Sequence, residues 1–175
     1  MDIKKIIYMS MLLAMGIVLS IIESFIPIFN GMIPGLKIGL SNIIILYVLY
    51  RYSIKDTFYV VILKVLLVGI LRTGLFSINF YFSIVGGILS VIFMSLFMKT
   101  KLSIIGVSIV GSIFHLIGQI IVAIILLNSF NLIYYIPYLI IFGTISGIII
   151  GIITKDILNK TEKICWKKLI NYVYL

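Results

Sequence analysis

Residues 102–127 read LSIIGVSIVGSIFHLIGQIIVAIILL, an apolar run that contains no Asp, Glu, Lys or Arg. A helix needs about 20 mostly apolar residues to cross the hydrocarbon core of a bilayer. This run is long enough, and it does not alternate polar and apolar residues as the strands of a membrane β-barrel do. It therefore predicts a membrane-spanning helix in an all-α membrane protein.

Five further apolar runs flank this stretch, so that the sequence predicts six transmembrane helices. Their approximate bounds are residues 6–26, 38–50, 57–75, 78–98 and 134–154. The connections are short, which favours antiparallel packing of sequential helices. The first run is expected to be retained rather than cleaved, because its apolar core is longer than that of a signal peptide and no small-residue cleavage site follows it.

The composition excludes the main soluble classes. Of the 175 residues, 63% are hydrophobic and 11% are charged, whereas a soluble domain is about half apolar and about a quarter charged. Disorder is also excluded, because it needs low hydrophobicity. The net charge of +9 comes from scattered basic residues with no compact patch, so nucleic acid is not an expected partner.

The basic residues predict the orientation, because cytoplasmic loops of membrane proteins collect Lys and Arg. With the N-terminus in the cytoplasm and six spans, 11 of the 14 basic residues fall on the cytoplasmic side. We therefore expect a multi-pass protein of the cell membrane with both termini cytoplasmic. Residues 1–155 would form the transmembrane domain. Residues 156–175 would form a basic cytoplasmic tail, either as an amphipathic helix on the inner leaflet or as a solvated segment.

Polar side chains concentrate in the outer half of the predicted bundle, and ionisable groups in spans are costly unless they face the protein interior. The candidate ligand-binding residues are Glu23, Lys37, Asn42, Lys64, Arg72, Asn79, His115 and Gln119. They predict a cup open to the outside in which three cations face one acid. A small anion with a carboxylate or phosphate would relieve this imbalance. The alternatives are that the cations extend to the membrane interface and that His115 is a packing residue.

Catalytic and metal chemistry are not expected of this chain. No nucleophile–base pair or carboxylate dyad is visible. One histidine and one outer acid are too few ligands for a metal, and the lone Cys165 permits neither an intrachain disulfide nor a cysteine cluster. We expect no cofactor.

Small residues recur at helical spacing and predict close helix contacts. Gly143, Gly147 and Gly151 form a double GxxxG in the last span, where internal packing is the favoured interpretation. Ser10 and Ala14 form a similar pair in the first span. For this pair, docking to another membrane subunit is the alternative to internal packing.

Three segments resemble a known membrane family: PGLKIGLSN at residues 34–42, Gly86-Gly87, and HLIGQ at residues 115–119. The family is labelled heptaprenyl diphosphate synthase component I and also Gx transporter family. It is similar in size and layout to the substrate-binding S components of energy-coupling factor (ECF) transporters. The resemblance implies a six-helix S-component-like bundle that binds a vitamin or small metabolite from outside. It implies partnership with a scaffold membrane subunit, which would dock at Ser10 and Ala14, and with ATPase subunits.

The synthase label is a second, separate implication. Prenyl-chain elongation holds magnesium through clustered aspartates, in line with the preference of magnesium for oxygen ligands. The aspartates of this chain, Asp2, Asp56 and Asp156, are far apart at predicted cytoplasmic edges. The sequence therefore favours a binding subunit over an enzyme. The alternative is a non-catalytic membrane component associated with polyprenyl diphosphate synthesis.

Overall fold

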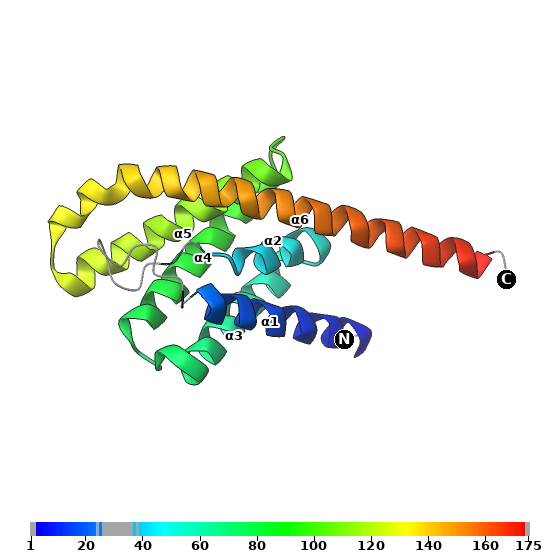
Figure 1. The fold of residues 1–175 in the computed structure, drawn as a ribbon, viewed down its shortest axis with the longest axis horizontal. Helices are drawn as coiled ribbons and strands as arrows, with labels where there is room; N and C mark the ends of the chain where they lie inside the picture. The colour runs from blue at the N-terminus through cyan, green and yellow to red at the C-terminus, as the bar shows by residue number, and fades with distance from the viewer. Residues whose placement is uncertain (1–2, 24, 26–36, 38, 174–175) are drawn as a thin grey trace.

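A computed structural model of the chain describes residues 3–23, 25, 37 and 39–173, with side chains described up to residue 161. Within these residues the fold is all-helical, with no strand, as predicted (Figure 1). Part of the motif at residues 34–42 lies outside the described residues. So do the side chain of Cys165 and those of the tail lysines beyond residue 161.

The α-helices follow the predicted apolar runs closely. Their bounds are α1 Ile3–Glu23, α2 Asn42–Arg51, α3 Ile54–Val68, α4 Ile78–Met98, α5 Ile104–Leu127 and α6 Ile136–Val173. A π-helical turn, η1 (Gly69–Thr73), extends α3, and a 3-10 turn, η2 (Phe130–Tyr135), leads into α6. The last helix continues well past the predicted end at residue 154, so that the backbone of the tail is helical as far as residue 173.

Local polar residues determine where several helices begin and end. Ser53 and Asp56 form a capping box at the start of α3. Ser77 and Ser103 accept hydrogen bonds from backbone N–H groups in the first turns of α4 and α5. At the other end of α5, Asn128 adopts a left-handed conformation with φ of 49° and ends the helix.

The helices differ in their ability to cross a bilayer. Four of them, α1, α4, α5 and α6, are long and apolar enough. In contrast, α2 has 10 residues and a length of about 15 Å, half the thickness of a hydrocarbon core. Helix α3 reaches about 30 Å only when it is joined to η1. The chain is therefore a helical membrane protein, and the number of its spans stays a prediction.

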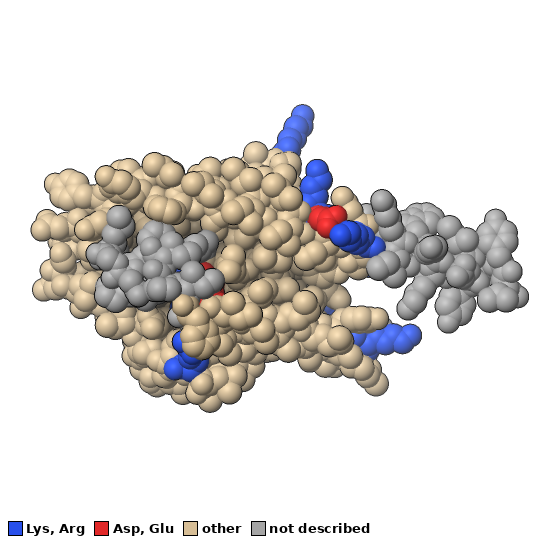
Figure 2. Space-filling view, in the orientation of Figure 1, with Lys and Arg blue, Asp and Glu red and all other residues tan. Residues whose placement is uncertain are grey.

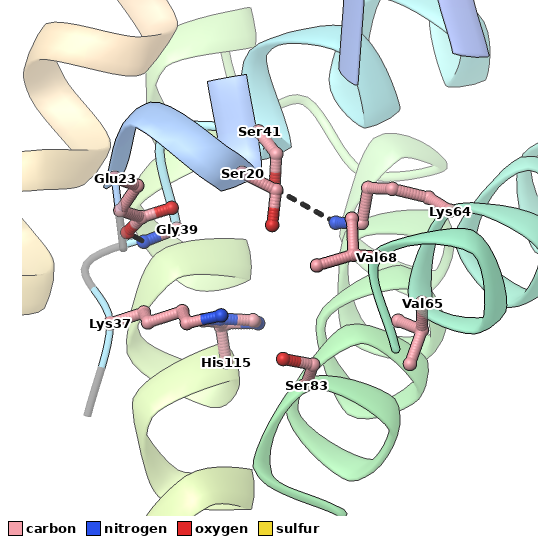
Figure 3. Close-up of a pocket in the computed structure, with 10 residues that line it drawn as sticks. All are labelled: Ser20, Glu23, Lys37, Gly39, Ser41, Lys64, Val65, Val68, Ser83 and His115. Atoms are coloured by element: carbon pink, nitrogen blue, oxygen red, sulfur yellow. Dashed lines mark hydrogen bonds between the residues drawn. The ribbon is translucent and has the colours of Figure 1, made fainter. Parts of the chain in front are cut away.

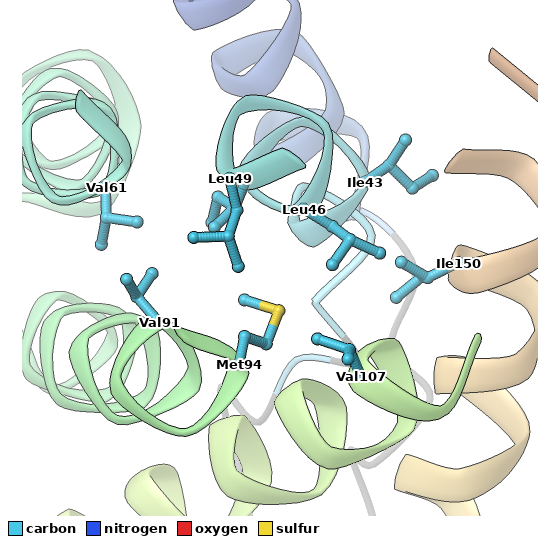
Figure 4. Packing of buried hydrophobic residues seen from close by; sticks show 9 residues of the cluster. Ile43, Leu46, Leu49, Val61, Val91, Met94, Val107 and Ile150 are labelled. Atoms are coloured by element: carbon cyan, nitrogen blue, oxygen red, sulfur yellow. The ribbon is translucent and has the colours of Figure 1, made fainter. Parts of the chain in front are cut away.

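The short helix α2 lies at the centre of the bundle. Every residue from Asn42 to Leu49 is buried, which is typical of a helix that is covered on all sides. It contacts each of the other α-helices. Around it a core cluster brings together side chains of α2, α3, α4, α5 and α6, among them Leu46, Val61, Met94 and Ile150 (Figure 4).

The glycine stripe of α6 is used for packing within the chain. A Cβ atom added at Gly147 would lie 2.5 Å from the Cα of Ile109 on α5, and one at Gly151 would lie 2.8 Å from the Cα of Ile105. Real Cβ atoms do not approach a backbone this closely. The stripe therefore allows the backbones of α5 and α6 to approach, as the internal-packing interpretation predicts.

The outer faces of the helices are apolar. Exposed large side chains cover α1 and α6, for example Met11, Met15, Ile145 and Ile149. Both ends of the chain lie at the same end of the bundle (Figure 1). Most of the Lys and Arg atoms on the face in Figure 2 lie in the half of the molecule that holds these ends.

Candidate functional site

One pocket gathers most of the predicted ionisable residues. It lies where the end of α1, the turn before α2, and the helices α3, α4 and α5 meet (Figure 3). Its lining residues are Ser20, Glu23, Lys37, Gly39, Ser41, Lys64, Val65, Val68, Ser83 and His115. The cavity volume is about 10 Å³, which is space for about one water molecule.

Glu23 ties the end of α1 to the turn before α2. Its carboxylate accepts hydrogen bonds from the backbone N–H groups of Gly39 and Leu40, the latter at 3.1 Å. Only 5% of the residue is exposed. The carboxylate therefore satisfies two amides next to the N-terminus of α2, where a negative charge is stabilised by the helix dipole.

Lys64 brings a buried positive charge to the same pocket. The residue is 4% exposed, and its Nζ atom donates a hydrogen bond of 2.8 Å to the hydroxyl of Ser41 (Figure 3). Glu23 interacts with it electrostatically. No direct ion pair joins the two residues, so that the charge of Lys64 is only partly compensated.

Lys37 is held in place through its backbone. Its N–H donates to the Oε1 atom of Gln119 at 2.9 Å, and its carbonyl accepts from the Nε2 atom of Gln119 at 3.2 Å. Its own Nζ atom is buried and has no hydrogen-bond partner among the described residues. Gln119 was predicted to contact the ligand, and in the structure it positions Lys37, whose ammonium group makes no hydrogen bond to the residues that the structure describes.

Asn42 and His115 lie beside this cluster. His115 is 5% exposed and lines the pocket. Asn42 is 2% exposed, and neither atom of its amide has a hydrogen-bond partner in the described part of the chain. Its Nδ2 atom would lie 2.7 Å from a Cβ atom at Gly39, directly behind the pocket wall. A buried amide without partners is costly, and it marks a place where an added polar group would be stabilised.

Arg72 and Asn79 lie outside the lining of this pocket. Arg72 is an exposed residue, and its guanidinium group stacks over the ring of Phe25, with its Cζ atom 3.7 Å from the ring centroid. The backbone carbonyl of Asn79 accepts a hydrogen bond from Ser83. The pocket therefore holds two lysines and one carboxylate, rather than the three cations that were expected to face Glu23.

Several lining residues carried no signal of their own in the sequence. Ser20, Val65, Val68 and Ser83 are ordinary residues of membrane helices. Ser20, Val68 and Ser83 lie one turn from Glu23, Lys64 and Asn79, which was the available clue, because residues three or four apart share a helix face. Val65, which adjoins Lys64 in the chain, carried no such clue. In the described part of the chain, no three His, Cys, Asp or Glu side chains gather as a metal site would require.

Gly39 is required at its position for two reasons, and we predict the effect of its replacement. Its φ is +90°, and a Cβ atom would come within 2.7 Å of Asn42 and 3.1 Å of His115. We expect Gly39→Ala to lower stability by about 1–2 kcal/mol from the backbone alone, and further from the displaced Asn42 amide. Unfolding in mixed micelles with increasing SDS would measure this change.

Gly74→Ala is the matched control for this prediction. Gly74 has a similar φ of +83°, but a Cβ atom there would have its nearest neighbour at 3.9 Å. The Gly74→Ala variant should therefore lose stability through its strained backbone alone, without a steric clash. Equal losses of stability in the two variants would contradict a special role for the space beside Asn42.

Comparison with known proteins gives one finding. A family model described as heptaprenyl diphosphate synthase component I matches residues 12–157, most of the chain and all of the residues that line the pocket. Neither a search of curated proteins nor a search of solved structures gave a match.

Proposed function

The chain belongs to the heptaprenyl diphosphate synthase component I family, and we propose that it is a non-catalytic membrane subunit that binds a small anionic ligand. The observation that carries the proposal is the charge of the pocket. Lys37 and Lys64 face it together, whereas Glu23, its one acid, is already engaged by two backbone amides. A carboxylate or phosphate would accept hydrogen bonds from both ammonium groups and compensate their charge.

The topology we propose has six spans with both termini in the cytoplasm and the pocket nearer the outside. The common position of the two chain ends and the gathering of basic residues toward them support this orientation (Figures 1 and 2). A ligand larger than a water molecule would need the elements around the pocket to separate. We place this opening at the end of α1, which in the described part of the chain packs mainly against α2 and α3, and it would break the hydrogen bonds of Glu23 with Gly39 and Leu40.

We further propose that the protein works as the S-component-like subunit of an energy-coupling-factor-type importer, with a scaffold membrane subunit and ATPase subunits as partners. The exposed stripe of α1 is the proposed docking surface. It includes Ala14 beside Met11 and Met15, with Ser10 at its edge. Small residues at this spacing allow another helix to approach closely.

The family name favours a second candidate function, that of a non-catalytic membrane component associated with heptaprenyl or polyprenyl diphosphate synthesis. The same two lysines would then contact a diphosphate group. This candidate predicts binding of a prenyl diphosphate and contact with a soluble synthase, without import.

Thermal unfolding of the purified protein in detergent tests both candidates. The panel would contain water-soluble vitamins with a carboxylate or phosphate, and prenyl diphosphates. A ligand at about 100 times its Kd stabilises by about 2.7 kcal/mol, which is a clear rise in Tm. We expect one anionic compound to give this rise, and Lys37→Met to abolish it.

Arg72→Met is the matched control, because Arg72 is a cation on the same side of the bundle that does not line the pocket. A vitamin-type anion that acts through Lys37 and not through Arg72 supports the capture subunit. A response to prenyl diphosphates alone supports the second candidate. A folded protein that responds to no anion, or equally in both variants, would refute the proposed pocket.

A further inference from the structure

A second, larger hollow lies at the other end of α1. It is a groove between α1 and α3 with a volume of about 420 Å³. Its lining residues are Lys5, Ile6, Met9, Ser10, Leu13, Asp56, Tyr59, Val60 and Leu63. All but three of these are large apolar side chains, so the groove suits an apolar occupant.

The groove has one polar end. Lys5 in the first turns of α1 and Asp56 in the first turn of α3 form an ion pair of 2.7 Å. The hydrogen bond from Lys5 lowers the pKa of the Asp56 carboxyl below its ordinary value. From this pair the groove follows both helices to Leu13 and Leu63, a distance of about 12 Å along α1. The occupant is therefore expected to be amphiphilic, with its polar group at the Lys5 end.

The surroundings of the polar end are basic. Lys4 and Lys55 are exposed and adjoin the ion pair in the chain, and Arg51 at the end of α2 is also exposed. Lys5 lies 5.9 Å from the ring centroid of Tyr52, next to Arg51. Among the described residues at this end, Lys5, Arg51 and Lys55 are basic and Asp56 is acidic, so a negatively charged head group would be attracted.

From this combination we propose that the groove is a binding site for an anionic phospholipid of the bilayer. One acyl chain lies between α1 and α3, and the phosphate contacts Lys5 and the neighbouring cations. A partner helix fits less well, because close helix packing uses small residues and Ser10 is the one small residue of the lining. The inference is independent of the ligand pocket, and the groove shares only Ser10 with the docking surface proposed on α1.

The test compares two lipids on the full chain after the native lipid has been removed in detergent. Dioleoyl phosphatidylglycerol is expected to raise the Tm and to stay bound in native mass spectrometry, whereas dioleoyl phosphatidylcholine is not. Lys5→Gln should weaken phosphatidylglycerol binding by about fivefold, the effect of one cation near an anionic surface. Lys101→Gln is the control, because Lys101 is an exposed lysine that does not line the groove.

Ser10→Phe provides a second variant that does not depend on charge. Ser10 is exposed, so the larger ring would fill the groove without disturbing the core, and lipid binding should be lost. Equal binding of the two lipids, equal effects of Lys5→Gln and Lys101→Gln, or full binding by Ser10→Phe would each overturn the proposal. Displacement of phosphatidylglycerol by farnesyl diphosphate at lower concentration would overturn it too, since the groove would then be a prenyl diphosphate site.

Discussion

Glu23→Ala is expected to destabilise the protein by about 3–5 kcal/mol, the range for breaking a buried set of charges by removing one partner. The substitution would leave the buried N–H group of Gly39 and the partly buried N–H group of Leu40 without their acceptor. It would also leave Lys64, which is 4% exposed, without the carboxylate that compensates it. Unfolding with SDS in mixed micelles would give the free-energy difference from the unmodified protein.

A double-mutant cycle separates the two contributions. Lys64→Met removes the buried charge and keeps an unbranched apolar chain of similar shape. If the charge imbalance matters, Glu23→Ala combined with Lys64→Met should be less destabilised than the sum of the two single variants. Strict additivity would show that Glu23 acts only through the two backbone amides.

Added inorganic phosphate should stabilise the Glu23→Gln variant more than the unmodified protein. In this variant Lys37 and Lys64 have no carboxylate beside them in the pocket, so that a bound anion compensates more charge.

Gly147→Ala is expected to destabilise the bundle by about 1–3 kcal/mol, the usual cost of an overpacked contact. The added methyl group would lie 2.5 Å from the Cα of Ile109 and 3.0 Å from its backbone nitrogen. Because these atoms belong to the backbone of α5, no change of side-chain rotamer relieves the clash. The two helices must move apart, and Gly147→Leu should cost more than Gly147→Ala.

Gly16→Ala on α1 is the matched control. There a Cβ atom would have its nearest neighbours at 3.8 Å, an ordinary contact. Since alanine has a higher helix propensity than glycine, Gly16→Ala should be neutral or stabilising by up to about 1 kcal/mol. The SDS midpoints of the two variants should therefore shift in opposite directions. A neutral Gly147→Ala would contradict the packing that we describe for the glycine stripe.

The fold was largely predictable because long apolar runs in a membrane protein have few alternatives to helix. The bounds of α4, Ile78–Met98, agree with the prediction at both ends. The position of α2 was not predictable. Its ten residues are short for a span, and periodicity does not reveal that a helix is buried on every side.

The candidate site was predictable in its residue types and less so in their roles. Glu23, Lys37, Lys64 and His115 do meet at one pocket. The depth of a residue in its helix shows which polar groups lie at the same level, but not which of them face one another. For this reason the exposed position of Arg72 and the backbone contact of Gln119 with Lys37 required the structure.

The central position of α2 has a consequence for the order of assembly during synthesis. Helix α1 packs on α2 and α3, and α4 packs on α3 and α5. Most of the helices that pack together are therefore neighbours in the sequence or are separated by one other helix. The contact between α2 and α6 is different, since the hydroxyl of Thr154 donates to the carbonyl of Ile43 across 111 positions of the chain. One side of α2 therefore stays uncovered until the last helix has been made. A chain that is released early would retain its local helix pairs and lack the contact that closes the bundle.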